Sequence, residues 1–293
     1  MFMKIMTSNI WGDYFCNPTT VRDKKLYSVY KKYAPDIIGF QEVTEGWYKS
    51  DLFKDLSLEY YFVGTEIINS TNFVPIAVKK NISLLAKGFE YFENTPDESK
   101  AVTWAVLRSH RLVFAVCNVH FWWMRGTKPA ETKRAKGVLD LTPKDHCQIR
   151  ADNAIQLSKL MKNISKRFAC PVFAFGDMNS TVTESVFHIY RKNGIKHLFD
   201  LAEQKDITCS MHGNPLLGTD GQFHGAQATE EYVSSLRKNL CLPKLDDNAG
   251  YLTSIDHIVA LGDGFKVSGY RVVTDQSALD ATDHSPVYAD IEL

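Results

Sequence analysis

The sequence predicts an α/β protein in which two packed β-sheets carry helices on their outer faces. Short apolar segments rich in Val, Ile, Phe and Tyr alternate with amphipathic segments along the 293 residues. Consecutive strand-like segments between Tyr60 and His120 favour antiparallel hairpins, and the flanking helical segments favour covered sheet faces. Because no Pro/Gly/Ser-rich linker and no internal repeat divides the chain, we expect a single domain over residues 1–293.

The expected strands are short, and Gly, Asn, Asp or Pro residues bound most of them. They cover Phe2–Ser8, Asp36–Gln41, Tyr60–Gly64, Pro75–Lys79, Val102–Arg108, Leu112–His120, Pro171–Gly176, Ser254–Ala260, Phe265–Val273 and Pro286–Ile291.

Helices are expected between some of these strands, where apolar residues recur at helical spacing. They cover Val21–Tyr33, residues 146–166 and Thr183–Asn193. Thr20 and Asp23 form a weak capping pair for the first helix. Gly194 directly follows the third helix, in the position where a helix often ends on glycine.

The composition limits the classes of function. Lys plus Arg number 34 and Asp plus Glu number 34, so the formal net charge is zero. A protein that grips nucleic acid along a broad surface usually has a basic excess, which is absent. No apolar run is long enough to cross a membrane. The cysteines are scattered without a C-x-x-C pair, and no signal-peptide pattern precedes the first strand. We therefore expect a cytoplasmic protein, or a secreted one if a leader was removed. We also expect a monomer.

Polar residues that could carry chemistry fall where apolar strands end or begin. They are Asn9, Glu42, His120, Asp177, Asn179, Asp256, Asp283 and His284. Each one alone is more often a turn residue or a helix-start residue than a site residue. The ends of buried strands nevertheless hold side chains rigidly at a solvent-facing edge, as an active site requires.

Taken together and in this order, the surrounding motifs resemble those of the endonuclease/exonuclease/phosphatase superfamily, over residues 3 to 291. The matching motifs are Ser8-Asn9-Ile10-Trp11, Gly39-Phe40-Gln41-Glu42-Val43, Asn118-Val119-His120, Gly176-Asp177-Met178-Asn179-Ser180, Ile255-Asp256-His257-Ile258 and Thr282-Asp283-His284-Ser285-Pro286-Val287. The resemblance implies a four-layer αββα sandwich with the site at one end. It also implies hydrolysis of a phosphoester that depends on a divalent metal, usually Mg²⁺, with Mn²⁺ as an alternative.

The resemblance implies a metal site made of Glu42, Asn9 and Asp283. Glu42 is the principal ligand, Asn9 offers a neutral oxygen, and Asp283 adds a second carboxylate, directly or through water. These hard oxygen donors suit Mg²⁺, which is commonly held by one or two carboxylates together with waters and phosphate oxygens. No Cys/His cluster has the spacing of a zinc site.

The resemblance also assigns the proton transfers. His284 is the candidate general base because imidazole titrates near neutral pH, and Asp256 orients it. Asp177 lies near the attacking water in relatives, and either Asp177 or His284 could take the proton. Asn179 and His120 would donate hydrogen bonds to the phosphoryl oxygens as charge grows on them.

Further residues are candidates for substrate binding. Arg150 matches a family arginine, although the glutamine that follows it by three positions in relatives is here Asn153. Trp122 and Trp123 could stack a base or a sugar, or could pack as a loop anchor. His224 could line the pocket or lie in solvent. We expect two long segments to be functional loops, which are Trp122–Thr142 and Ser210–Tyr251. The two tryptophans open the first segment, and His224 lies within the second.

Several functions therefore stay open. The leading hypothesis is a Mg²⁺-dependent hydrolase acting on a compact phosphodiester or phosphomonoester, or on single-stranded nucleic acid. The zero net charge makes an endo- or exonuclease acting on a longer polynucleotide the second hypothesis. A binding protein without activity is the third, and the complete set of motif residues argues against it.

Overall fold

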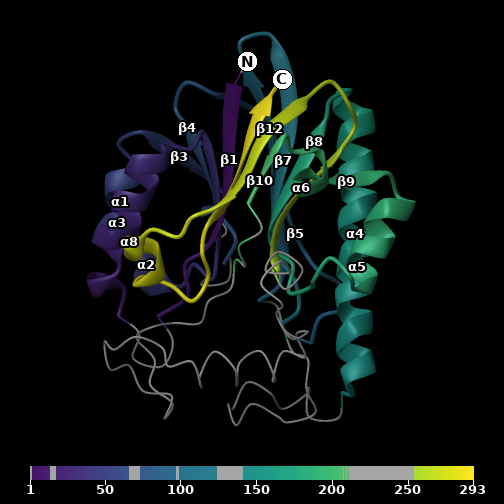
Figure 1. Cartoon of the computed structure of the whole chain (residues 1–293), viewed down its shortest axis with the longest axis horizontal. Helices are drawn as coiled ribbons and strands as arrows, with labels where there is room; N and C mark the ends of the chain where they lie inside the picture. The colour runs from purple at the N-terminus through teal and green to yellow at the C-terminus, as the bar shows by residue number, and fades with distance from the viewer. Residues whose placement is uncertain are drawn as a thin grey trace.

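The computed structural model describes residues 2–13, 18–65, 73–96, 99–123, 141–206, 208, 210 and 254–293. Two mixed sheets pack face to face and helices cover both outer faces, so the chain forms four layers (Figure 1). Most neighbouring strands are antiparallel, and the parallel exceptions are β1 with β2, β7 with β8 and β10 with β12. The predicted αββα architecture is confirmed.

The first sheet has seven strands and the second has six. The seven-stranded sheet runs in the order β10 (Gln204–Lys205), β12 (Lys266–Val272), β13 (Val287–Glu292), β1 (Phe2–Asn9), β2 (Ile37–Gln41), β4 (Ile76–Lys79) and β3 (Tyr60–Val63). The six-stranded sheet runs in the order β5 (Ser83–Tyr91), β6 (Ala101–Ser109), β7 (Leu112–His120), β8 (Val172–Asp177), β11 (Asp256–Leu261) and β9 (Ile195–His197).

Each sheet has its own set of helices on its outer face (Figure 1). The seven-stranded sheet carries α1 (Asp23–Tyr33), α2 (Glu45–Tyr48), α3 (Asp51–Leu56) and α8 (Gln276–Leu279), preceded by the 3-10 turn η1 (Thr19–Val21). The six-stranded sheet carries α4 (Pro143–Phe168) and α5 (Ser185–Lys192), and the short α6 (Leu198–Leu201) contacts β9, β11 and β12.

The central strands are rich in apolar residues on both faces because both faces are buried. On β1, Ile5 belongs to the core between the sheets, whereas Met6 belongs to the core under α1 and α3. On β8, Phe175 points into the core between the sheets and Ala174 toward α4. The alternation of side chains along a strand thus supplies two separate cores at once.

The predicted strands and helices all exist, with ends displaced by a few residues, but one predicted cap is wrong. Helix α1 begins at Asp23, and Thr20 lies in η1 and does not cap it; the N-cap residue is Arg22, which makes no side-chain capping bond. Gly194 does follow α5 with a left-handed φ of 74°, as predicted.

The strand register gathers the chemically interesting residues at one end of the sandwich. In the six-stranded sheet, His120 pairs with Asp177 across the parallel β7–β8 ladder, and Asp177 pairs with Asp256 across the antiparallel β8–β11 ladder. In the other sheet, Asn9 pairs with Gln41, directly before Glu42. This end lies opposite the N- and C-termini (Figure 1). In the part of the chain that is described, no helix is both long and apolar enough to span a membrane.

Candidate active site

The two sheets meet in a polar bridge directly beneath the site. The amide nitrogen of Gln41 donates to the side-chain oxygen of Asn118 at 2.6 Å, and Thr7 donates to the side-chain oxygen of Gln41 at 3.2 Å. The amide nitrogen of Asn118 donates in turn to the carbonyls of Phe40 and Pro75. Because these groups are buried, their mutual hydrogen bonds fix the spacing of the strands that carry Glu42 and His120.

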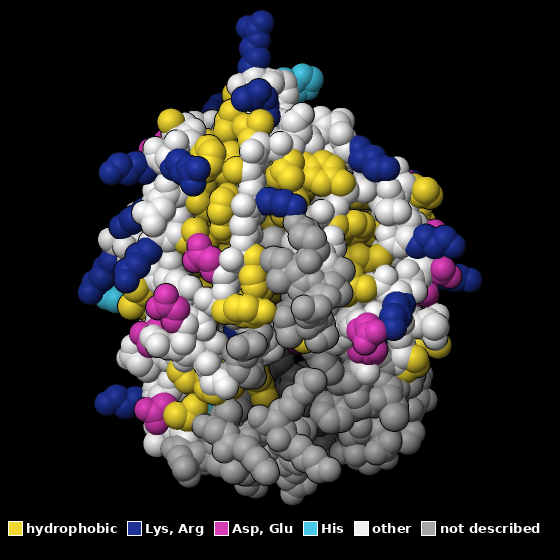
Figure 2. All heavy atoms as spheres, turned by 180° about the vertical axis from the view of Figure 1, so that it is seen from behind, with side chains coloured by type: hydrophobic (Ala, Val, Ile, Leu, Met, Phe, Trp, Pro, Cys, Tyr) yellow, Lys and Arg dark blue, Asp and Glu magenta, His cyan; other side chains and the backbone are white. Residues whose placement is uncertain are grey.

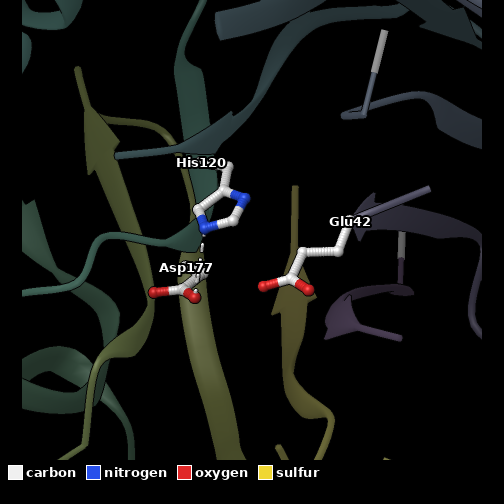
Figure 3. Close-up of side chains that lie close together, drawn as sticks. All are labelled: Glu42, His120 and Asp177. Atoms are coloured by element: carbon white, nitrogen blue, oxygen red, sulfur yellow. Dashed lines mark ion pairs between the residues drawn. The ribbon is translucent and has the colours of Figure 1, made fainter. Parts of the chain in front are cut away.

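Asn9 lies between two carboxylates that come from different sheets. Its amide nitrogen is 3.1 Å from an oxygen of Glu42 and 3.1 Å from Oδ2 of Asp177, while its oxygen accepts the backbone N–H of Trp11 at 3.0 Å. Glu42 also accepts the backbone N–H of Gly12 at 3.2 Å. Figure 3 shows the two carboxylates facing each other, with the ring of His120 above Asp177. Asn9 therefore spaces the carboxylates through its nitrogen, and its oxygen is engaged with the backbone.

The backbone around the site is in an unusual conformation. Trp11, Glu42 and Asn179 have φ values of 52°, 61° and 46°, in the left-handed region that costs energy for residues other than glycine. Such conformations persist where the surrounding structure holds them in place, and they concentrate at functional sites. At Glu42 the left-handed turn follows β2 directly, and the carboxylate lies beside Asn9.

His284 and Asp256 form a buried pair supported by a serine. Nδ1 of His284 donates to Oδ2 of Asp256 at 2.8 Å, and Ser210 donates to the same oxygen at 2.8 Å. The opposite ring nitrogen, Nε2, lies 4.0 Å from Oδ2 of Asp177. One ring nitrogen of His284 is thus fixed by a carboxylate, and the other lies toward Asp177. This is the arrangement of an oriented acid–base group.

The charges of this cluster shift its pKa values in opposite directions. Burial and the neighbouring Asp256 raise the pKa of Asp177 to about 7, although His284 opposes the shift. Burial alone would lower the pKa of His284, but Asp256, Asp283 and Asp177 outweigh it and raise that pKa well above its usual value. Without a metal, the imidazole therefore holds its proton and Asp177 titrates near neutral pH.

His120 lies beside a buried lysine that the sequence patterns do not indicate. Nζ of Lys100 is 3.0 Å from Nε2 of His120, which is itself 3.5 Å from Oδ2 of Asp177. Burial, together with the positive charges of Lys100 and His284, lowers the pKa of His120 well below its usual value, so the ring is neutral. Only 5% of Lys100 is exposed, so its ammonium group is buried beside His120.

The donor set fits a divalent metal ion. One potential ligand atom each from Glu42, His120 and Asp177 lie within 4.8 Å of one another, and the same holds for Asp177, Asp256 and His284. Desolvation and the charge of Glu42 raise the pKa of Asp283, although His284 opposes the shift. A cation would relieve this mutual repulsion of carboxylates. The charge of Glu42 reaches Asp283, which among the described residues belongs to neither of these ligand groups.

Asn179 and Arg150 contact residues around the carboxylate cluster. The backbone N–H of Asn179 donates to Asp177 at 2.9 Å, and its amide nitrogen donates to the carbonyl of Phe121 at 3.1 Å, directly after His120. Arg150 is buried in α4, where its guanidinium lies 3.6 Å from Glu184 and 3.3 Å from the sulfur of Cys147. Arg150 therefore lies behind the site, where it contacts Glu184 and Cys147. 

Trp122 is not placed to stack on a substrate. Its side chain is 1% exposed, its indole N–H donates to Nδ1 of His146 at 2.9 Å, and its backbone N–H donates to Asn153 at 3.2 Å. Of the two alternatives for Trp122, stacking platform or packed loop anchor, its burial and these contacts favour the packed anchor. Asn153, which departs from the family pattern, holds this anchor. Trp123 is 44% exposed and stays a candidate platform, whereas His224 lies outside the described residues.

Sequence reasoning missed Lys100, Ser210 and Arg22 as residues around the site. Lys100 follows a charged stretch that is typical of a solvated loop, and Arg22 occupies an ordinary helix start. Only Ser210 had a signal, since it opens a long polar segment expected to be functional. His257, which follows Asp256 in the same motif, is buried with Nε2 2.9 Å from the carbonyl of Ser180.

Comparison with known proteins decides the family. The model of the endonuclease/exonuclease/phosphatase family matches residues 6–284. The chain belongs to this family. A search of curated proteins finds no match.

Solved structures of family members share the fold at low identity. A family protein from Bacteroides vulgatus has a TM-score of 0.68 and 19% identity, with 100% of this chain and 99% of that chain covered. The mannosyl-6-phosphatase of Bacteroides thetaiotaomicron has a TM-score of 0.67 and 16% identity, with 99% and 100% covered. Truncated Caenorhabditis elegans TDP2 has a TM-score of 0.64 and 16% identity, with 100% and 98% covered. At these identities the likeness establishes the fold and leaves the substrate open.

Proposed function

We propose that the protein is a Mg²⁺-dependent hydrolase that cleaves a compact phosphoester by in-line attack of an activated water. The observation that carries the proposal is the chain of contacts from Glu42 through Asn9 to Asp177, with the His284–Asp256 pair on the far side of Asp177. It joins a metal-binding carboxylate to an acid–base pair within one buried cluster.

The bound metal would supply charge neutralisation and polarise a phosphoryl oxygen. Glu42 is the principal proposed ligand, with Asn9 holding its carboxylate in place and Asp283 contributing from the loop before β13. A nearby cation would favour the ionised forms of Asp177 and Asp283, whose pKa values are raised in its absence.

Asp177 is the better-placed proton acceptor of the two candidates. In the metal-free protein the pKa of Asp177 is about 7, so part of its carboxylate is ionised near neutral pH, and a bound cation would increase that part. The carboxylates around His284 raise its pKa well above the usual value, so the imidazole already holds a proton. We infer that Asp177 takes a proton from the water that attacks phosphorus, while the bond from phosphorus to the leaving-group oxygen breaks and that oxygen gains a proton from solvent. Protonated His284, fixed by Asp256, stabilises the charge that develops on the phosphoryl group. Asn179 and His120 both lie next to Asp177.

A small substrate suits this site better than a long polyanion. The chain has no excess of basic residues to hold a polynucleotide. Lys100 instead places one buried cation beside His120, close to the predicted position of the phosphoryl oxygens. The mannosyl-6-phosphatase among the structural neighbours indicates that this fold accommodates a sugar phosphate. We therefore propose a phosphomonoester or compact phosphodiester as the first substrate class to test.

The test is an activity panel in the presence and absence of Mg²⁺. It compares sugar phosphates, inositol phosphates, a generic phosphodiester, sphingomyelin, single-stranded and abasic DNA, and RNA. We expect Mg²⁺-dependent release from a compact substrate, and Glu42→Ala and His284→Ala should each lower turnover by at least about 100-fold, since each removes a principal catalytic group.

Matched controls separate the site from general damage to the protein. Asp263→Ala removes an exposed carboxylate and His188→Ala removes an exposed imidazole on α5, so both should keep wild-type rates. Wild-type rates in Glu42→Ala and His284→Ala would overturn the site assignment, and activity confined to long polynucleotides would instead support the nuclease hypothesis.

A further inference from the structure

Arg22 places a fully buried guanidinium next to the proposed metal site. Its side chain is 0% exposed and lies between the rings of Trp11 and Trp47, with centroid distances of 5.3 Å and 4.7 Å. Aromatic faces stabilise a buried cation in this geometry. A buried charge is nevertheless costly unless its donors are used, so its hydrogen-bond partners indicate what it does.

The partners of Arg22 are backbone carbonyls from two separate loops. Nη1 lies 2.8 Å from the carbonyl of Ile10, 2.9 Å from that of Trp11 and 3.1 Å from that of Ala281, and Nε donates to the carbonyl of Pro18 at 3.2 Å. One planar group thus joins the turn after β1 to the loop before β13. A rigid fork of donors can hold several acceptors in fixed directions, which an amine on a flexible stem cannot.

Of the two loops that Arg22 joins, one contacts Asn9 and Glu42 and the other carries Asp283. Trp11 and Gly12 donate their backbone N–H groups to Asn9 and Glu42 respectively, so the turn held by Arg22 also orients both side chains. On the other loop, Ala281 precedes Thr282, whose hydroxyl donates to the carbonyl of Asn9 at 2.8 Å. Asp283 follows directly, so both loops meet at the same place.

The charge of Arg22 also reaches the site. Burial lowers the pKa of Arg22 to about 10, while the negative charges of Asp283, Glu42 and Asp13 act in the opposite direction. Arg22 therefore stays charged at neutral pH and its field includes two proposed ligand carboxylates. A fixed cation by itself would repel a metal ion, so the charge and the positioning effects of Arg22 predict opposite results when it is replaced.

We propose that Arg22 is a positioning residue that sets the affinity of the metal site, because it fixes the turn that holds Asn9 and Glu42 and the loop that carries Asp283. The inference rests on the proposed metal site. Its hydrogen bonds reach the backbone segments that orient the proposed ligands, so we expect the positioning effect to outweigh the repulsion.

The test measures Mn²⁺ affinity directly, by isothermal titration calorimetry, in Arg22→Lys and Arg22→Met. Loss of a residue that orients metal ligands typically weakens binding by about 10–100-fold, and we expect both variants to fall in that range. Arg22→Lys keeps the charge but loses the fork, so its affinity should stay close to that of Arg22→Met. With saturating metal, the KM for substrate should be near the wild-type value while the metal concentration for half-maximal activity rises.

Two further variants keep the test decisive if Arg22→Met does not fold. Trp47→Phe removes the indole N–H that donates to the carbonyl of Trp11 at 2.9 Å, and should weaken Mn²⁺ binding less than Arg22→Lys does. Ile164→Ala destabilises the core under α4 far from these loops and should leave Mn²⁺ affinity unchanged. 

The outcomes distinguish this inference from the proposed function. Wild-type affinity in Arg22→Lys, or tighter binding in Arg22→Met, would overturn the positioning role while leaving the metal site intact. A wild-type protein that binds neither Mn²⁺ nor Mg²⁺ would overturn the proposed metal site itself. Weaker binding in Ile164→Ala equal to that in Arg22→Lys would attribute the effect to stability alone and also overturn the inference.

Discussion

Asp177 is the residue at which the two halves of the proposed chemistry meet. It accepts from Asn9 on the metal side and lies 4.0 Å from His284 on the acid–base side. It is also buried next to Asp256, so its charged form is unfavourable without a compensating cation. The stability of the protein and the binding of metal should therefore both depend on the protonation of this one carboxyl group.

The raised pKa of Asp177 predicts a pH-dependent response to Mg²⁺. The pKa of an aspartate carboxyl is ordinarily 3.8, whereas that of Asp177 is about 7 in the folded, metal-free protein. Between these values the folded protein holds a proton that the unfolded chain releases, so metal-free stability falls as pH rises. Metal binding requires the ionised carboxylate. The increase in Tm caused by saturating MgCl₂ should therefore grow from about pH 5 to about pH 8.

Thermal unfolding at several pH values, with and without Mg²⁺, measures this effect. Asp177→Asn should reduce the pH dependence of the Mg²⁺-induced increase in Tm, because it removes the titrating group while keeping the side-chain shape. A residual slope in that variant is expected from Asp283, whose pKa is shifted in the same direction. An increase in Tm that is the same at every pH in the wild-type protein would contradict the coupling.

At the level of strands, the site depends on close approach between the two sheets. A Cβ on Gly39 of β2 would lie 2.2 Å from the ring of Phe175 and 2.6 Å from the side-chain oxygen of Asn118. Neither neighbour can withdraw easily, since Phe175 is part of the core between the sheets and Asn118 belongs to the polar bridge. Glycine is required at this position for lack of space.

Gly39→Ala should destabilise the protein by about 1–3 kcal/mol, the usual range for overpacking a core, and should lower activity by moving β2 away from β7. Chemical denaturation and the rate on the substrate identified in the panel are the measurements. Gly269→Ala, in β12 of the same sheet, is the control, because the nearest neighbour of its Cβ would be the side chain of Asp290, at 3.2 Å. Equal losses of stability in both variants would show that space at Gly39 is not the cause.

The long apolar strands and the motif residues at their ends were predictable from the sequence, whereas short and exposed elements were not. Strand β5 was missed because it is an edge strand whose mixed sequence, SLLAKGFEY, has no clear alternation. The short helices α2 and α3 contain too few turns to show a periodic pattern. They form because Trp47 and Phe53 pack against the seven-stranded sheet, which is a tertiary effect.

The roles of individual site residues depended equally on tertiary contacts. Glu42, Asp177, Asp256 and His284 could be named from motifs because they follow or precede recognisable strands. Lys100 could not, since the local sequence of a buried lysine does not differ from that of a solvated one. The burial of Trp122 follows from its contacts with α4, whose residues lie more than twenty positions along the chain.

Across the whole molecule, the balance of charge favours a small contact with substrate. The described part of the face in Figure 2 has Lys and Arg side chains spread over it, and they form no continuous basic surface there. Together with the zero formal net charge, this predicts weak salt dependence. At fixed free Mg²⁺, kcat/KM should change by less than about tenfold between roughly 50 and 200 mM salt, whereas binding through many phosphate contacts loses about 10³–10⁵ over that range.

Steady-state kinetics on a compact phosphoester and on single-stranded DNA at each salt concentration measure this dependence. A steep loss on DNA together with substantial DNA cleavage at low salt would indicate a polyanion contact and would favour the nuclease hypothesis. The compact substrate acts as the internal control, because its single phosphate cannot give a steep slope.

The proposed site is divided between the two sheets, with Asn9 and Glu42 on one and His120, Asp177 and Asp256 on the other. The Asn9–Asp177 hydrogen bond crosses this boundary above the bridge formed by Gln41 and Asn118. A small sliding of one sheet over the other would separate the carboxylates while leaving the ladders of both sheets intact. Catalysis should therefore depend on how the two sheets are aligned, and gentle warming should abolish activity before the secondary structure is lost.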